Sequence, residues 1–203
     1  MNYADSLFDA FMYPLEAVSL ASRRRALIPR AGGDVLELGV GTGANLPHYD
    51  PQRIRSLTLT DLSLSPRLRD RAEDLRERTG LQNGEVHLHT ADAEDLPYGS
   101  ESFDTVVFTL VFCSVPDQSR ALGEVRRVLR PGGRILFVEH VRPHGPSGRL
   151  VDHVNPLWHA VTRECNINRD TAQAIRRAGF RIEELRVGAR GFLVDGVAVR
   201  PVP

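Results

Sequence analysis

The chain has 203 residues, of which 41% are hydrophobic and 26% charged, a composition typical of one folded globular domain. Its 26 basic and 26 acidic residues balance, so no net charge attracts nucleic acid. None of the 26 basic residues is lysine, which excludes a P-loop lysine, a pyridoxal Schiff base and the Tyr-x-x-x-Lys pair of short-chain dehydrogenases.

Apolar segments bounded by turns alternate with amphipathic charged segments along the chain. A helical segment is predicted over residues 1–33, where it would close over the site as a lid, lie on a membrane surface or pack on the sheet. The predicted strands cover residues 34–40, 56–62, 85–92, 103–112, 134–141, 181–187 and 197–200. The predicted helices cover residues 65–80, 117–133 and 169–180, and a turn or helix start covers 44–49. This alternation predicts an open, mostly parallel sheet with helices on both faces.

No segment predicts a membrane span, because apolar runs such as residues 106–111 are far shorter than the roughly 20 residues that a spanning helix needs. The N-terminal residues show neither a basic region nor a small-residue cleavage site. Two cysteines are too few for a disulfide framework in a chain of this size. We therefore expect a cytoplasmic protein.

Three glycines on alternate positions, Gly39, Gly41 and Gly43, follow the first predicted strand. In an open parallel sheet this turn lies at the carboxyl ends of the strands, where ligands bind. Glycines let the turn bend sharply and let a ligand approach the main chain. The string also fits the dinucleotide pattern G-x-G-x-x-A, with Asp61 as its ribose-binding acid, so a dinucleotide site and a plain turn are alternatives.

Three further features favour a smaller, positively charged ligand. Glu37 stands two positions before the first glycine, and a carboxylate there suits an ammonium or sulfonium group better than a pyrophosphate. Asp92 ends the third predicted strand, within reach of an adenine amino group, and Ala93 follows it. A helix, a Pro-Gly-Gly turn at residues 131–133 and a strand come next, an order that nucleotide-dependent dehydrogenases lack.

These segments together resemble the successive motifs of class I S-adenosylmethionine-dependent methyltransferases, over roughly residues 34–141. The matching motifs are ELGVGTGAN, LTDLS, ADAEDLP, FDTVVFTLVFCSV and LRPGGRILFVEH. The resemblance implies a single α/β, Rossmann-like domain over residues 34–203. Its seven-stranded sheet would be mostly parallel, with the last strand antiparallel and helices on both faces.

A narrower resemblance, to the methyltransferase-like family that includes animal thiol S-methyltransferases, extends further along the chain. It rests on GTGAN, TLVFCSV, RVLRPGG, VEHV and NPLWHAVTRECNINRDTAQAIRRAGF. The animal members are associated with membranes or lipid droplets. Bacterial phospholipid N-methyltransferases and quinone-biosynthesis C-methyltransferases share the first set of motifs.

The resemblance implies S-adenosyl-L-methionine as the cofactor and gives each matching residue a role. The glycine turn would pack on its methionyl part, and Glu37 would face its ammonium or sulfonium side. Asp61 would bind both ribose hydroxyls, unless it caps the next helix, and Asp92 would accept from adenine, unless it is only a solvated acid. The expected cofactor-binding residues are Glu37, Gly39, Gly41, Gly43, Asn45, Asp61, Leu62, Asp92, Ala93, Thr109 and Leu110.

Residues 140–170 form an insert that we expect to bind the methyl acceptor. His140 is the candidate general base, because it ends a strand on the cofactor side. Helix capping by the histidines and packing by the cysteine are the alternatives. No tight ligand spacing predicts a metal site. The expected acceptor-binding residues are Cys113, His153, Trp158 and His159.

The predicted function is methyl transfer by direct displacement from S-adenosylmethionine to a small, hydrophobic thiol, amine or activated carbon. The alternatives are a nicotinamide-dependent oxidoreductase and a non-catalytic cofactor-binding protein. We expect no nucleic-acid partner and consider peripheral membrane contact, while nothing in the sequence sets the oligomeric state.

Overall fold

The computed structural model describes residues 20–79, 85–143, 145–149, 151–153, 155 and 166–202. Its strands are β1 (Gly33–Leu38), β2 (Ile54–Asp61), β3 (Val86–Thr90), β4 (Phe103–Thr109), β5 (Leu129–His140), β6 (Arg181–Gly188) and β7 (Leu193–Val199). The α-helices are α2 (Ala21–Leu27), α3 (Pro66–Thr79), α4 (Gln118–Val128) and α6 (Thr171–Arg177). Short 3-10 helices are η2 (Ile28–Arg30), η3 (Leu46–His48) and η4 (Ala189–Gly191).

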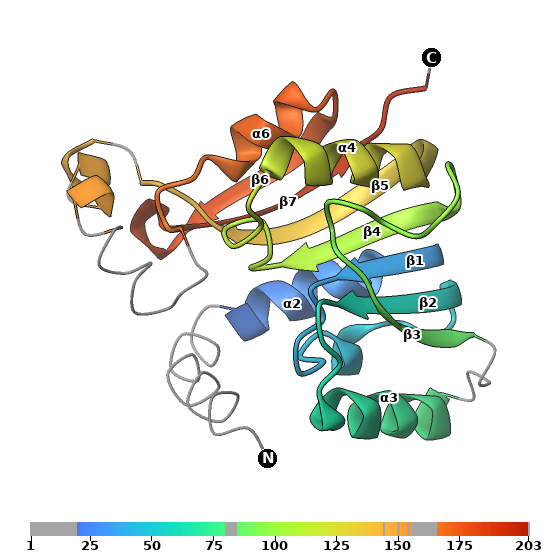
Figure 1. Cartoon of the computed structure of the whole chain (residues 1–203). Helices are drawn as coiled ribbons and strands as arrows, with labels where there is room; N and C mark the ends of the chain where they lie inside the picture. Colours follow the sequence, from blue (N-terminus) through green and yellow to red (C-terminus); the bar gives the residue numbers. More distant parts are fainter. Residues whose placement is uncertain are drawn as a thin grey trace.

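The strands form one seven-stranded sheet in the order β3-β2-β1-β4-β5-β7-β6 (Figure 1). Strands β1 to β5 pair in parallel, whereas β7 is antiparallel to both of its neighbours. The predicted Rossmann-like fold is therefore confirmed, including the antiparallel last strand. The carboxyl ends of the parallel strands meet at one edge of the sheet, the left edge in Figure 1.

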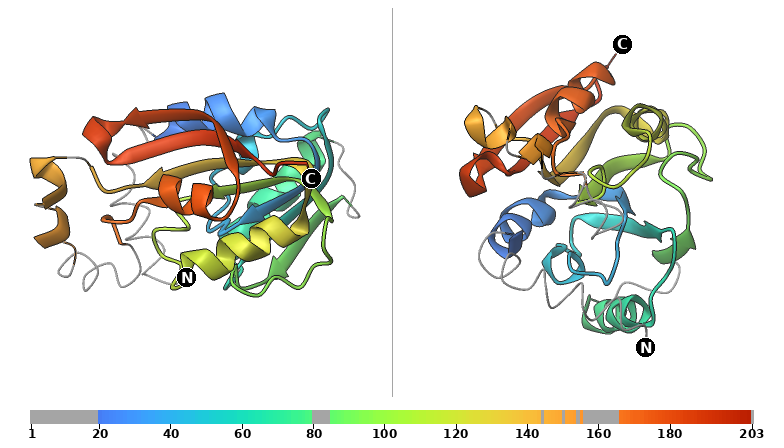
Figure 2. Two further views of the ribbon diagram at one scale, coloured as in Figure 1. Left: turned by 90° about the horizontal axis from the view of Figure 1, so that it is seen from above. Right: turned by 60° about the vertical axis from the view of Figure 1, so that its left-hand side comes forward.

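Helices cover both faces of the sheet (Figure 2). Strand side chains alternate between the faces, so neighbouring residues of one strand enter different cores. On one face Val35, Val107 and Leu136 pack with α2, η2 and α3. On the other, Leu36 and Phe108 join the core formed with α4 and α6. Consecutive residues at the end of one strand therefore point to opposite faces of the sheet.

Strand β7 is longer than predicted, because Asp195 and Gly196 look like turn residues in the sequence. The structure instead buries Asp195, which is 1% exposed, within the strand. Its carboxylate forms ion pairs with Arg23 of α2 and Arg186 of β6. Paired in this way, a carboxylate is tolerated in the sheet.

Strand β5 begins earlier than predicted, because the Pro-Gly-Gly segment belongs to it rather than to the end of the helix. Helix α4 ends at Val128, and residues 130–133 form a bulge opposite β4. Gly132, with φ +77°, adopts the left-handed conformation that glycine tolerates best, and its N–H donates to the Arg200 carbonyl at 2.9 Å.

The described part of the N-terminal segment packs on the sheet. Leu20, Leu27 and Ile28 are fully buried in the core that contains Val35 and Leu136. The apolar residues expected earlier in this segment, up to residue 19, lie outside the described residues. No helix in the described part of the chain is long and apolar enough to cross a bilayer.

Candidate active site

The glycine turn after β1 is shaped by three left-handed residues. Gly39, Gly41 and Gly43 have φ values of +61°, +55° and +81°. A Cβ on Gly39 would lie 2.4 Å from Val111 Cγ2, and one on Gly43 would lie 3.0 Å from Leu46 Cδ1. Around Gly41, no heavy atom of the described residues lies within 4 Å of that position. The outer glycines therefore allow close packing, and the middle one leaves open space beside the main chain.

Glu37, at the end of β1, is buried beneath this turn and only 2% exposed. Its carboxylate accepts from Asn45 Nδ2 at 2.9 Å and from Tyr49 Oη at 2.6 Å. Burial raises the pKa of Glu37 to about 7, although both hydrogen bonds and the charge of Arg24 oppose the shift. Burial also lowers the pKa of Arg24 to about 10, against the attraction of Glu37.

Asn45 joins the ends of two neighbouring strands. Its Nδ2 donates to Glu37 and, at 3.2 Å, to Thr109 Oγ1 at the end of β4. Its Oδ1 is buried and has no hydrogen-bond partner among the described residues. A buried acceptor without a donor is unfavourable, so a donor brought by a ligand would stabilise the site. Sequence reasoning identified Glu37 and Asn45 but missed Tyr49, because an isolated tyrosine in a turn gives no signal of its buried partner.

Asp61 closes the site beside β1. Its Oδ2 accepts from the Gly41 N–H at 2.8 Å, and its Oδ1 accepts from Ser63 N–H at 3.4 Å. It does not cap α3, because that helix begins at Pro66 and Ser65 Oγ accepts from the Leu68 N–H at 3.2 Å. Leu62 follows with 71% of its surface exposed, an apolar side chain left uncovered next to the acid.

Asp92 lies in an ordered acidic turn after β3. Its Oδ1 accepts from the Glu94 N–H at 2.9 Å, and its carbonyl accepts from the Asp95 N–H at 3.1 Å. Glu94 in turn accepts from the Asp117 N–H at 2.8 Å, which joins the turn to the start of α4. Asp92 is exposed and Ala93 half-buried, so both roles expected for Asp92 remain predictions.

The chain leaves β4 in a strained conformation at Leu110, whose φ is +58°. Side chains other than glycine rarely adopt this region, and such strain clusters at functional sites. The Leu110 N–H donates to the Val138 carbonyl at 2.8 Å, which holds the turn against β5. Thr109 and Leu110, both half-buried, thus lie next to the glycine turn, whose Gly39 approaches Val111.

Known proteins resemble this chain in sequence. A methyltransferase domain family matches residues 36–137. The human thiol S-methyltransferase TMT1A is 34% identical over 179 residues, which cover 79% of this chain and 68% of that protein. The phosphatidylethanolamine N-methyltransferase of Cereibacter sphaeroides is 38% identical over 151 residues, covering 70% of this chain and 72% of that protein. The chain belongs to the class I S-adenosylmethionine-dependent methyltransferases.

Solved structures share the fold of this methyltransferase. An S-adenosylmethionine-dependent methyltransferase from Mesorhizobium loti superposes with a TM-score of 0.64 at 21% identity, covering 92% of this chain and all of that one. The [4+2]-cyclase SpnF superposes with a TM-score of 0.69 at 19% identity, covering 91% of this chain and 80% of that one. The nicotinamide-dependent alternative is wrong, because the family is that of methyltransferases with S-adenosyl-L-methionine as cofactor.

On the acceptor side, the methyltransferase buries Cys113, which is 1% exposed. Its Sγ lies 3.5 Å from the Leu110 carbonyl, so in the described structure Cys113 packs in the interior and does not line an open pocket. His140, the last residue of β5, is half-buried. His153 is exposed, with Nδ1 2.7 Å from the Arg149 carbonyl. Trp158 and His159 lie outside the described residues.

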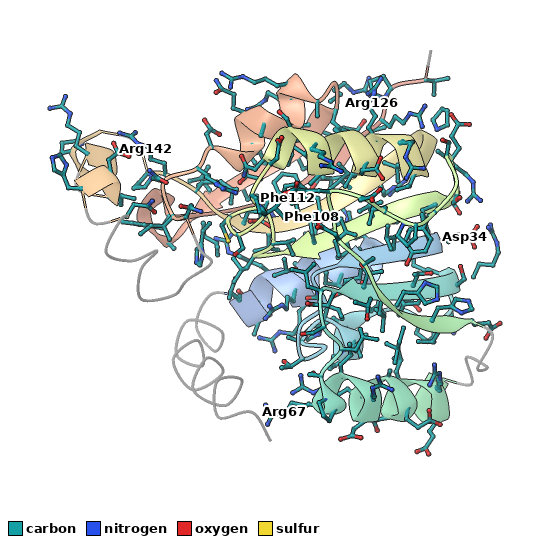
Figure 3. The ribbon with its side chains drawn as sticks, in the orientation of Figure 1. Asp34, Arg67, Phe108, Phe112, Arg126 and Arg142 are labelled. Atoms are coloured by element: carbon teal, nitrogen blue, oxygen red, sulfur yellow. The ribbon has the colours of Figure 1, made fainter. Side chains whose placement is uncertain are left out.

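Two other features of the methyltransferase lie apart from this site. A cavity of about 560 Å³ at the amino edge of the sheet is lined by Arg53, Arg55 and Arg130 among others. Arg130 is paired there with Asp34. Asp34 lies at the edge of the sheet opposite the carboxyl ends of the parallel strands (Figure 3). No group of three or more histidine, cysteine, aspartate or glutamate side chains in the described residues could hold a metal ion.

Proposed function

We propose that this methyltransferase transfers the methyl group of S-adenosylmethionine to a small hydrophobic thiol. The choice of a thiol as acceptor rests on the number of residues over which the chain aligns with thiol S-methyltransferases. Human TMT1A and TMT1B align over 179 and 185 residues, well beyond the 36–137 match, and therefore into the segments that follow β5. An amine is the second candidate, because the phosphatidylethanolamine enzyme is 38% identical.

The described residues fit the cofactor. The open space beside Gly41 admits a ligand to the main chain, and the unpartnered Oδ1 of Asn45 offers an acceptor for an ammonium group. The Asp61 carboxylate keeps lone pairs for ribose hydroxyls besides the Gly41 bond, and exposed Leu62 offers an adenine a flat apolar surface. We assign Asp92 and Ala93 to the adenine edge, and Thr109 and Leu110 to the region of the methyl group.

Glu37 acts in this proposal through its neighbours. Both of its oxygens are bound by Asn45 and Tyr49, so it fixes the shape of the turn and favours a positive group nearby. The sequence predicts that Glu37 faces the ammonium or sulfonium side of the cofactor directly or through water, and its burial favours the indirect role.

When bound, S-adenosylmethionine supplies a methyl group on a sulfonium sulfur, an electrophile that needs no further activation. The protein must align a nucleophile with it and exclude water. A thiol has a modest pKa of about 8.5, so a weak base is sufficient to ionise it. We assign that role to His140, which lies at the carboxyl end of β5 beside the exit of β4.

The test is a screen of labelled methyl transfer to an alkyl thiol, phosphatidylethanolamine vesicles and a quinone precursor. The proposal expects the thiol to have the highest kcat/KM. A higher value for phosphatidylethanolamine would establish the amine instead. Binding of S-adenosylhomocysteine without transfer to any acceptor would support a non-catalytic protein. A cytoplasmic location, the absence of a nucleic-acid partner and peripheral membrane contact stay predictions.

A further inference from the structure

A second buried carboxylate, that of Glu139, lies at the acceptor side of the site. Glu139 is fully buried near the end of β5. Its Oε1 accepts from the backbone N–H groups of Val111 at 2.8 Å and Phe112 at 3.0 Å. Its Oε2 accepts from the N–H of Cys113 at 3.2 Å. Three successive amides of the segment after β4 are therefore held by one side chain.

The geometry of the strand ends explains how one carboxylate reaches three amides. The pairing of β4 with β5 places Val138 beside Thr109, so Glu139 follows next to the exit of β4. Leu110 then turns the chain with its positive φ, and the Val111 carbonyl accepts from the N–H groups of Ser114 and Val115. Residues 111–115 thus form a single tight turn whose first three N–H groups all donate to Glu139. Burial raises the pKa of Glu139 to about 7, and these hydrogen bonds oppose that larger effect.

The carbonyl groups of the same turn are held by other segments. The Phe112 carbonyl accepts from Gln118 Nε2 at 2.9 Å and from Arg169 Nη1 at 2.8 Å. The Cys113 carbonyl accepts from the Asn166 N–H at 2.8 Å. Asn166 and Arg169 belong to the segment that ends the expected acceptor insert. The turn therefore joins the end of β4 to that segment, and its hydrogen bonds leave it little freedom to move independently.

Packing fixes the turn further. The Phe112 side chain is fully buried, and its ring lies 4.4 Å from that of Phe108, at the carboxyl end of β4 (Figure 3). A displacement of the turn would therefore move both the core under β4 and the segment, residues 166–169, that ends the acceptor insert.

We propose that Glu139 is a positioning residue for the methyl acceptor. It fixes the turn 111–113 between β4 and residues 166–169, and so sets where the acceptor lies relative to the transferred methyl group. This inference rests on the proposed function, because it assumes that the acceptor binds beside this turn. Glu139 itself, enclosed by the turn, touches neither substrate nor cofactor.

Glu37 provides a comparison within the same chain. Both acids lie one residue before the end of a parallel strand, are buried and accept hydrogen bonds. Glu37 binds Asn45 and Tyr49, which follow the glycine turn, whereas Glu139 binds the turn after β4. Neutralising each acid should therefore affect a different ligand. Glu37→Gln should weaken cofactor binding, and Glu139→Gln should impair use of the acceptor.

The experiment compares wild type with Glu139→Gln, Glu37→Gln and Glu183→Gln. The last makes the same chemical change at an exposed site and should resemble wild type in every assay. The readouts are the Kd of S-adenosylhomocysteine, the kcat/KM for 1-octanethiol at saturating cofactor, and amide hydrogen exchange over residues 111–113. Gln cannot accept all three N–H groups, because its amide nitrogen is a donor.

For Glu139→Gln we expect a Kd within about twofold of wild type, a kcat/KM lower by about tenfold or more, and exchange at 111–113 faster by a similar factor. The inference is overturned if kcat/KM and exchange both stay at wild-type values, or if the Kd rises by the same factor as kcat/KM falls.

If Glu139→Gln does not fold, Gln118→Met is the second variant, because it removes one hydrogen bond from the Phe112 carbonyl. It must then show the same pattern with smaller changes. If wild type methylates phosphatidylethanolamine instead of the thiol, the proposed function fails, and the same comparison with that acceptor still decides the role of Glu139.

Discussion

The glycine turn gives the sharpest test of the site, because two neighbouring glycines should fail in different ways when replaced by alanine. Gly39→Ala combines the cost of a left-handed alanine, about 1–2 kcal/mol, with an overlap against Val111 that costs about 1–3 kcal/mol more. Gly41→Ala carries only the first cost, because no described atom lies near its Cβ position. We therefore expect Gly39→Ala to lose about 2–5 kcal/mol of unfolding free energy and Gly41→Ala only about 1–2 kcal/mol.

Cofactor binding should show a separate effect at Gly41. Its methyl group would occupy the open space that the cofactor needs beside the main chain, so affinity should fall even though the protein remains folded. Urea unfolding measures the first quantity, and titration with S-adenosylhomocysteine measures the second. Gly123→Ala is the matched control, because Gly123 lies in α4 with a negative φ and free space around it, and alanine there should stabilise the helix by about 0.5–1 kcal/mol. A Gly41→Ala protein that binds S-adenosylhomocysteine as tightly as wild type would refute this assignment of the turn.

Three further changes test other parts of the structure. Asp61→Asn keeps the size of the side chain but removes the charge that accepts from the Gly41 N–H and that we assign to the ribose hydroxyls. Titration should show an affinity for S-adenosylhomocysteine at least about tenfold weaker, with the free energy of unfolding changed by less than about 1 kcal/mol. Wild-type affinity would contradict the ribose role. Burial raises the pKa of both Glu37 and Glu139 to about 7, so between about pH 4.5 and 7 the folded state binds more protons than the unfolded state. The free energy of unfolding should therefore fall as the pH rises from about 4.5 to 7, by up to about 3 kcal/mol for each acid. Urea unfolding of Glu37→Gln and Glu139→Gln should show a flatter pH dependence than that of wild type. Cys113→Ala should cost about 1 kcal/mol of stability and leave kcat/KM for the thiol within about twofold, whereas a loss greater than tenfold would place this cysteine in the acceptor site.

The sequence was sufficient to predict the fold because the patterns that indicate strands and helices are local and repeat along the chain. Alternating apolar segments gave the strands, and β1, β2 and β4 lie within a few residues of their predicted positions. The errors at β5 and β7 have a shared cause. Pro131 and Asp195 are unfavourable in a strand by local rules, and each is accommodated by a partner from elsewhere: a bulge bonded to Arg200, and ion pairs from Arg23 and Arg186. Arg23 and Arg200 are far in the sequence from the residues that they hold.

The candidate site was predictable to the extent that its residues stand next to a motif. Glu37 could be found because it stands two positions before the glycines, and Asp61 because it lies near the end of a predicted strand. The structure does bring Asp61 to the Gly41 amide. The positions of Tyr49 and Glu139 could not be found this way. Each acts through a contact across the sheet or the core, and only the three-dimensional register brings it to its partner. The structure also removed one alternative, because Ser65 rather than Asp61 caps α3.

The fold by itself does not determine the reaction, since a [4+2]-cyclase shares it with a TM-score of 0.69. The reaction of such a protein depends on the residues at its site and not on the architecture of its sheet. In the arrangement that we propose, Glu37 organises the cofactor side and Glu139 the acceptor side, each through hydrogen bonds to a segment that follows a parallel strand. The two segments meet where Gly39 approaches Val111, and we expect the nucleophile to reach the methyl group beside this contact. Changes of acceptor among relatives should therefore concentrate in the turn after β4 and in the insert bonded to it, while the glycine turn stays the same.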